Sequence, residues 1–269
     1  MNQTKRAVRL AASTALVALI AAGSVFVATD ATAEDPLQIR IGTEGAYPPF
    51  NSLTADGDLV GFDIDIANAL CEEMQAECEF VVQDWDGMIP ALLANKFDAI
   101  IASMSITEER MERIDFSGKY YNTPPAIAVP KDSEIAGVAP EDLADITIGA
   151  QSATTHSNYA EEKFPDTELR LYPTPDEYKL DIAAGRIDAV IDDVVVLSEW
   201  INSDDGACCM VLDVLVPDPV INGIGAGIGV RKGEEELRDA FSAAIQAIRD
   251  NGTYEEINNK YFDFDVYGG

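Results

Sequence analysis

Charged, hydroxyl and aromatic side chains follow the predicted strands in the first half of the chain. They are Glu44, Tyr47, Trp85, Ser103, Ser105 and Arg110. Thr107 is a good helix N-cap, which places Arg110 in the first turn, where an arginine is unfavourable for the helix dipole. Together with free backbone N–H groups near Ser105, its guanidinium would instead form a carboxylate site. The alternative is an exposed Arg110 paired with Glu108 or Glu109.

The second half of the chain offers matching chemistry. The loop 151–156 contains Thr155 and His156 and precedes a helix, so its hydroxyl and N–H groups suit the same anion from another side. Asp193 follows a later strand and would accept an ammonium group, whereas Asp192 beside it could equally be a solvated surface acid. A carboxylate clamp with an ammonium acceptor describes recognition of an α-amino acid backbone.

Glu44 with Tyr47 and Trp85 suits a cationic side chain with an aliphatic stem, through ion pairing and cation–π contact. The alternatives are a solvated loop acid and two core aromatic residues. Neither Ser103 nor Ser105 has a histidine in its motif, and His156 alone completes no catalytic triad. We therefore expect a binding protein that needs no cofactor and no metal.

Strand and helix patterns alternate along the chain, which is typical of an α/β fold with parallel strands. The segment 94–101 (ANKFDAII) resembles 184–191 (AGRIDAVI), and at the same offset of 90 residues Ser103 corresponds to Asp193. Ile41-Gly42 corresponds loosely to Ile148-Gly149. Two similar units suggest two lobes, and ligands of such sheets lie beyond the carboxyl ends of the strands.

The composition and the N-terminus indicate an exported protein. The 269 residues carry a net charge of −30, which argues against nucleic acid and anionic lipid as partners. Residues 1–33 combine three basic residues, an apolar run and a small-x-small site ending at Ala33, as in a cleaved signal peptide. A single membrane anchor is the alternative, since the run approaches spanning length. A bacterial lipoprotein is not indicated, because no cysteine follows the site.

Export makes disulfides possible for Cys71, Cys78, Cys208 and Cys209. A bridge between Cys71 and Cys78 would link the end of a helix to the next strand, and we favour it. Zinc binding is the alternative, but there is no CxxC motif and the lone histidine lies in another segment. The state of the adjacent pair Cys208 and Cys209 stays open.

Two Pro-rich passages, 120–125 and 217–225, separate the units. A strand and two helices follow the second passage, with a stop at Asn251-Gly252 and a capping box from Thr253 and Glu256 for the last helix. By analogy with known two-lobed folds, we expect one lobe of residues 34–122 plus 218–269 and a second of residues 123–217. Two crossings would then form a hinge.

Several motifs resemble one known family. They are 42–50 (GTEGAYPPF), 59–65 (LVGFDID), 98–101 (DAII), 103–110 (SMSITEER) and the end 252–268 (GTY…KYFDFDVYG). Together they resemble the periplasmic polar amino-acid binding proteins of ABC importers, nearest the lysine/arginine/ornithine and histidine binders, with the opine binders beside them. The resemblance runs from Leu37 to Gly269.

This resemblance implies a type II periplasmic-binding-protein fold, in which two lobes, each a mainly parallel sheet flanked by helices, close on a ligand. It implies that Arg110, Ser105 and Thr155 hold the carboxylate, and that Asp193 and Ser103 take the α-amino group. Tyr47 and Trp85 would flank the side chain, and Glu44 would meet its distal cation. It also places a disulfide at Cys71 and Cys78.

The implied function is delivery of a cationic L-amino acid (arginine, lysine, ornithine or histidine) to an inner-membrane ABC permease by a periplasmic monomer. Two positions depart from the pattern, since Ala102 stands where a serine is frequent and His156 where glutamine is frequent. The loop 149–156, Glu44 and Trp85 look nearer the opine binders, so an octopine- or nopaline-like ligand remains the alternative. A secreted dehydratase and a sensor on the same fold are further alternatives.

Overall fold

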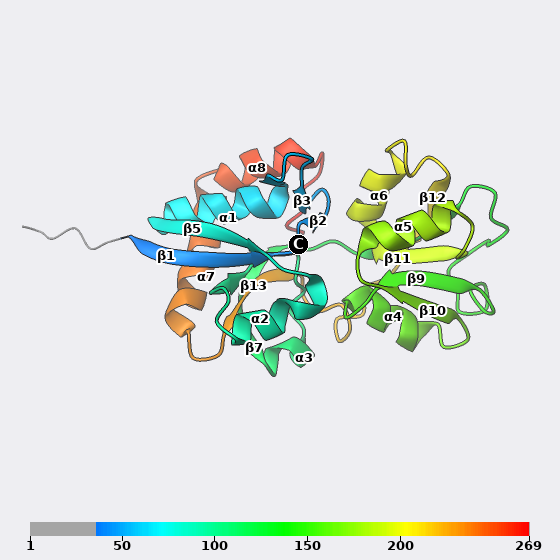
Figure 1. The fold of residues 1–269 in the computed structure, drawn as a ribbon, viewed down its shortest axis with the longest axis horizontal. Coiled ribbons are helices and arrows are strands. Elements are labelled where there is room, and N and C mark those ends of the chain that lie inside the picture. The colour runs from blue at the N-terminus through cyan, green and yellow to red at the C-terminus, as the bar shows by residue number, and fades with distance from the viewer. Residues whose placement is uncertain (1–35, 269) are drawn as a thin grey trace, which may run out of the picture. The chain divides into compact units, whose positions relative to one another are not determined.

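The computed structural model describes residues 36–268, and its two main sheets have five strands each (Figure 1). The strand order of the first sheet is β5 (Ala76–Val82), β1 (Leu37–Thr43), β6 (Ala99–Ile100), β13 (Ala226–Arg231) and β7 (Ile114–Tyr121). That of the second is β10 (Glu168–Tyr172), β9 (Thr147–Gln151), β11 (Ala189–Asp193), β8 (Pro125–Pro130) and β12 (Cys209–Val214). A small sheet contains β2 (Ala46–Tyr47), β3 (Asn51–Leu53) and β4 (Leu59–Val60).

The two main sheets share one topology, and each has a single reversed strand. Strand β13 is antiparallel to both of its neighbours in the first sheet, and β8 is antiparallel to both of its neighbours in the second. The chain enters the second sheet between β7 and β8 and returns between β12 and β13. These crossings run side by side, because Tyr121 pairs with Ala226 at one end and Ala126 pairs with Val214 at the other. The expected mainly parallel α/β architecture is confirmed.

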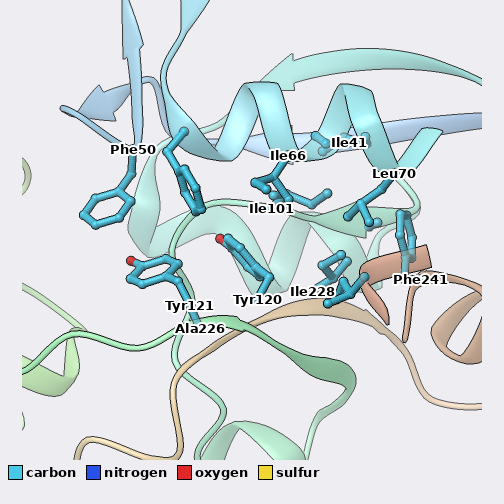
Figure 2. Packing of buried hydrophobic residues seen from close by; sticks show 14 of the residues in the cluster. Ile41, Phe50, Ile66, Leu70, Ile101, Tyr120, Tyr121, Ala226, Ile228 and Phe241 are labelled. Carbon is cyan, nitrogen blue, oxygen red and sulfur yellow. The ribbon is translucent and has the colours of Figure 1, made fainter. Parts of the chain in front are cut away.

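Helices cover both faces of the first sheet. They are α1 (Phe62–Glu73), α7 (Glu235–Asp250) and α8 (Thr253–Tyr261) on one face, and α2 (Met88–Leu93) on the other, next to the short helices η1 (Trp85–Gly87) and α3 (Glu108–Met111). Figure 2 shows Ile66 and Leu70 of α1 with Phe241 of α7, beside the strand residues Ile41 and Ile228. Successive strand residues point to opposite faces, so Ile101 joins this cluster while Ile100 packs against α2.

The second sheet is buried in the same way. Helix α4 (Thr155–Lys163) packs on the face that presents Ile127 and Val129. Helices α5 (Pro175–Ala183) and α6 (Val194–Ile201) pack on the face that presents Ala126 and Ala128. Burial on both faces explains why these strands read as continuous apolar runs.

The internal repeat has a structural counterpart in strand register. Ala99 pairs with Ile41 in the first sheet, and Ala189, 90 residues later, pairs with Ile148 in the second. The expected correspondence between Ile41 and Ile148 is therefore confirmed. As a result Ser103 and Asp193 come from equivalent regions of the two sheets.

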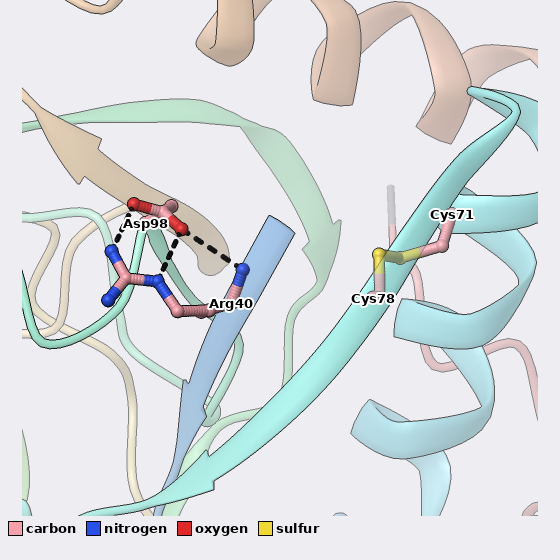
Figure 3. Close-up of a disulfide and its surroundings, with 4 residues drawn as sticks. All are labelled: Arg40, Cys71, Cys78 and Asp98. Carbon is pink, nitrogen blue, oxygen red and sulfur yellow. Dashed lines mark hydrogen bonds and ion pairs between the residues drawn. A yellow bond between two sulfur atoms is a disulfide. The ribbon is translucent and has the colours of Figure 1, made fainter. Parts of the chain in front are cut away.

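The expected disulfide joins Cys71 at the end of α1 to Cys78 in β5, with a Cα–Cα distance of 6.2 Å (Figure 3). The neighbouring strand β1 is fixed by Arg40, whose Nε and Nη2 donate to the two carboxylate oxygens of Asp98 at 3.0 and 2.9 Å. Such a bidentate pair holds the chain that precedes β6 against β1.

The helix ends differ in part from expectation. Helix α7 ends at Asp250 with Asn251 as its C-cap, and Gly252 is left-handed with φ 91°, which agrees with the stop predicted at Asn251-Gly252. The predicted capping box at the start of α8 is wrong, because α8 begins at Thr253 itself and Asn251 Oδ1 accepts from the Thr253 N–H. Helix η1 runs directly into α2, and Pro90 lies in the first turn of α2, where its missing N–H is tolerated.

The predicted signal peptide, residues 1–33, lies outside the described residues. Among residues 36–268, no helix is long and apolar enough to cross a membrane. The sequence left the adjacent cysteines open. Cys208 is exposed, Cys209 is buried, and neither is in a disulfide.

Candidate functional site

A pocket of about 330 Å³ lies where strands of both main sheets end. Its lining residues are Glu44, Tyr47, Trp85, Ala102, Ser103, Ser105, Arg110, Gln151, Thr154, Thr155 and His156. An adjoining hollow of about 610 Å³ shares five of these residues, namely Tyr47, Ser103, Ser105, Thr155 and His156, and adds Asp193. Seven of the eight predicted ligand-binding residues therefore line one pocket, and Asp193 lies in the neighbouring compartment.

Arg110 brings a cation into the pocket from α3. Its helix is capped as expected, since the Thr107 hydroxyl accepts from the Arg110 N–H. The guanidinium donates to the carbonyls of Ser105 at 2.9 Å and Ala153 at 3.3 Å, and lies 5.3 Å from the ring centroid of Trp85. It has no salt-bridge partner among residues 36–268, so the expected alternative of pairing with Glu108 or Glu109 is not observed. Burial lowers the pKa of Arg110 to about 10, which leaves it charged at neutral pH.

Glu44 is a buried acid directly after β1, with 7% of its surface exposed. Its Oε1 accepts from Gln151 Nε2 at 2.6 Å, from the end of β9 in the other sheet. Burial raises the pKa of Glu44 to about 7, and the nearby Asp192, Asp84 and Asp86 add to this effect. The expected alternative of a solvated loop acid is therefore wrong for Glu44.

Both aspartates at the end of β11 are buried, so Asp192 is not the surface acid that the sequence allowed. Asp193 accepts from the Thr123 hydroxyl and from the Val195 N–H, and burial raises its pKa to about 7. Asp192 accepts from the hydroxyl groups of Tyr178 and, at 2.5 Å, Tyr47.

His156 completes the group around Asp192. Its Nδ1 lies 3.2 Å from Asp192 Oδ1, and burial lowers its pKa, which favours the neutral imidazole at pH 7. The hydrogen bond from Tyr47 to Asp192 joins β2 of the small sheet to β11 of the second main sheet. The sequence hinted at this arrangement only by placing a histidine where glutamine was expected.

The aromatic and hydroxyl residues are held from both sides. Trp85 Nε1 donates to the Ala153 carbonyl at 3.1 Å, and Tyr47 is buried with its hydroxyl on Asp192. Thr155 is the first residue of α4, and the preceding Thr154 caps that helix by accepting from Ser157 N at 3.0 Å. An N-terminal N–H group without a helical partner favours an anion nearby.

Sequence reasoning did not identify two polar contributors. Gln151 fixes Glu44 across the pocket, although its side chain carried no role in the sequence pattern. Asp63 lies behind Ser103, and its signal was only an acid next to apolar neighbours at a helix start. Among residues 36–268 no group of three or more His, Cys, Asp and Glu side chains is placed to hold a metal ion.

Comparisons with known proteins agree with this architecture. Residues 39–264 match the family model of the bacterial extracellular solute-binding proteins, family 3. An L-arginine-binding protein of Pseudomonas aeruginosa is 45% identical over 233 residues, which cover 86% of this chain and 90% of the relative. A histidine-binding periplasmic protein of Escherichia coli K12 is 40% identical over 245 residues, which cover 90% of this chain and 94% of the relative.

Among solved structures, a Salmonella typhimurium periplasmic binding protein, described as having high arginine specificity, superposes with a TM-score of 0.78 at 32% identity. The match covers 84% of this chain and 99% of that one. Each of these relatives is a binding protein. The family model and the two relatives span most of the described chain, so this protein belongs to the bacterial extracellular solute-binding proteins of family 3.

Proposed function

We propose that this protein captures a cationic L-amino acid (arginine, lysine, ornithine or histidine) in the periplasm and delivers it to an ABC transporter permease. One observation carries the proposal. The pocket contains the cation of Arg110, unpaired among the described residues, together with the buried acid Glu44, and the adjoining hollow adds the acid Asp193. A buried charge is costly until a counter-charge reaches it, so the site is complementary to a ligand with one carboxylate and two cationic groups.

Each part of the ligand has a proposed partner. Arg110 binds the carboxylate, with Ser105 and Thr155 beside it, because a guanidinium pairs with a carboxylate in a bidentate manner. Asp193 and Ser103 accept from the α-ammonium group. Glu44 meets the distal cation of the side chain.

The aliphatic stem then lies between aromatic rings. Tyr47 and Trp85 flank it, and the face of an indole ring also attracts a cation. Ala102, which lines the same pocket, offers a methyl group there and no hydrogen bond.

Closure is proposed as the step that traps the ligand. Residues 34–122 plus 218–269 form one lobe in this proposal, and residues 123–217 form the other. Contacts such as Tyr47–Asp192 and Glu44–Gln151 connect these segments and belong to the closed arrangement. A ligand that touches both lobes only in the closed form shifts the population toward it. The permease would then recognise the closed, monomeric binding protein.

The kinship with arginine- and histidine-binding proteins supports this choice of ligand, and the periplasmic relatives support export through the N-terminal signal peptide. A second candidate is an opine, in which the α-nitrogen carries an additional acidic group. The adjoining hollow, which Ser103 and Asp193 line, favours it, because a substituent on the nitrogen would extend from the pocket into this hollow.

A thermal-shift screen of the mature protein tests the proposal against the common amino acids plus ornithine, citrulline, octopine and nopaline. A ligand at about 100 times its dissociation constant adds roughly 2.7 kcal/mol of stability. Shifts confined to cationic amino acids support the proposal, and shifts with opines alone move the assignment to the second candidate. Arg110→Ala should lose the shift, whereas the exposed neighbour Arg113→Ala should retain it.

A further inference from the structure

Asp63 is a fully buried carboxylate behind the pocket, in the first turn of α1. It has no salt-bridge partner among residues 36–268. Instead it accepts three hydrogen bonds from side chains. Ser103 Oγ donates to Oδ2 at 2.9 Å, Asn51 Nδ2 donates to Oδ2 at 2.8 Å, and the Tyr120 hydroxyl donates to Oδ1 at 2.8 Å.

A second bond closes this group into a ring. The backbone N–H of Ser103 donates to the Tyr120 hydroxyl at 3.0 Å, so Ser103 is held through both its main chain and its side chain. Figure 2 shows Tyr120 beside Tyr121 in the hydrophobic cluster of the first sheet. Ser103 also has a left-handed backbone with φ 56°, which a non-glycine residue adopts only where its surroundings impose it.

The direction of the Ser103 hydroxyl follows from this geometry. A serine hydroxyl has one hydrogen and two lone pairs. Because an ionised Asp63 only accepts, the hydrogen of Ser103 is committed to it. Tyr121 also interacts with the Ser103 side chain. Ser103 lines both the pocket and the hollow, so one lone pair is left for a ligand there.

We propose that Asp63 is a positioning residue that fixes Ser103 as a hydrogen-bond acceptor, so that the site selects ligands with a donor at the α-nitrogen. This rests on the proposed function, which assigns the α-ammonium group to Ser103. The selection follows because an ammonium group donates only, while a ligand without that group leaves the Ser103 lone pair without a donor and the Asp193 carboxylate without a counter-charge.

A purely structural role makes a different prediction. An acid in the first turn of a helix also stabilises the helix dipole. Asp65 is the matched control, because it lies in the same turn but bonds to Lys260 and Tyr261 on the surface, away from Ser103. Asp63→Asn and Asp65→Asn therefore remove the same charge from the same helix end. Only Asp63 is hydrogen-bonded to Ser103, which lines the pocket.

The test is calorimetric titration with L-arginine and with 5-guanidinopentanoate, which is arginine without its α-amino group. Asp63→Asn should weaken arginine binding about tenfold or more, the range for a hydrogen bond to a charged group. It should change binding of 5-guanidinopentanoate less than about twofold, and Asp65→Asn should change neither. In a Ser103→Ala background, Asp63→Asn should have little further effect on arginine.

Equal weakening of both ligands by Asp63→Asn, or no weakening of either, would overturn the inference while leaving the proposed function intact. If the wild type binds no cationic amino acid, the proposed function fails and the inference fails with it. Where Asp63→Asn yields little folded protein, Tyr120→Phe carries the same test. It removes one donor to Asp63 and the acceptor of the Ser103 N–H, so the same split between the two ligands is expected.

Discussion

Binding of a cationic side chain should release protons, because Glu44 lies in the pocket with a pKa of about 7. Burial is the main cause of this raised pKa, and a guanidinium placed against the carboxylate would stabilise its ionised form. About half of the unliganded protein therefore has a neutral Glu44 at pH 7 and must lose that proton when arginine binds. Protonation thus competes with the ligand.

The size of the effect follows from the ionised fraction of Glu44. That fraction is about 0.9 at pH 8 and about 0.1 at pH 6, so Glu44 alone weakens arginine binding about tenfold over this range. Asp193, whose pKa is also about 7, contributes a similar factor through the α-ammonium group. The wild type should then lose about 100-fold and Glu44→Gln only about tenfold.

Calorimetric titration with L-arginine at pH 6, 7 and 8 measures both slopes. Repeating the titration at pH 7 in two buffers of different ionisation enthalpy counts the released protons. Glu79→Gln is the matched control, since this glutamate is exposed on β5, and its profile should follow the wild type. An identical pH slope for the wild type and Glu44→Gln would refute the placement of Glu44 against the ligand cation.

Further predictions follow from other charged and sulfur groups. Arg110→Ala should abolish binding of every amino acid in calorimetry, because the shared carboxylate loses its guanidinium; retained tight binding would contradict the clamp. Alkylation of unfolded, unreduced protein should label two of the four cysteines and spare Cys71 and Cys78, and peptide mapping that finds these two labelled would rule out the disulfide. The unliganded protein should gain stability toward denaturant as pH falls from about 8 to about 5. The reason is that Glu44 and Asp193 have a pKa of about 7 in the folded protein and a lower one in the unfolded chain, so protonation below pH 7 stabilises the folded state. A flat or opposite profile would contradict their raised pKa values.

The sequence predicted the fold because its signals are local. The 90-residue repeat corresponds to equal register at Ala99 and Ala189, and apolar runs mark strands that are buried on both faces. The Thr107 cap was visible for the same reason, since cap and helix are adjacent. The failed capping box at Thr253 shows the limit, because Asn251 competed successfully for the same N–H group.

The polar groups behind the pocket were beyond prediction because their partners are distant in sequence. Tyr47 and Asp192 are 145 residues apart, and Ser103 and Asp63 are 40 apart. No spacing rule connects such residues, and each alone looks like a common core tyrosine or helix-start acid. Only the folded chain shows that Gln151 reaches Glu44 from the other sheet.

The most direct test of the central claim is the ratio of dissociation constants for L-arginine and L-citrulline. The two ligands share length, shape and α-amino acid backbone, and citrulline replaces the guanidinium by a neutral urea group. Loss of one charged partner at a buried acid costs roughly 2 to 3 kcal/mol, so we expect arginine to bind about 30- to 150-fold more tightly at pH 8. Equal affinity for the two ligands would contradict a site built for a cationic side chain.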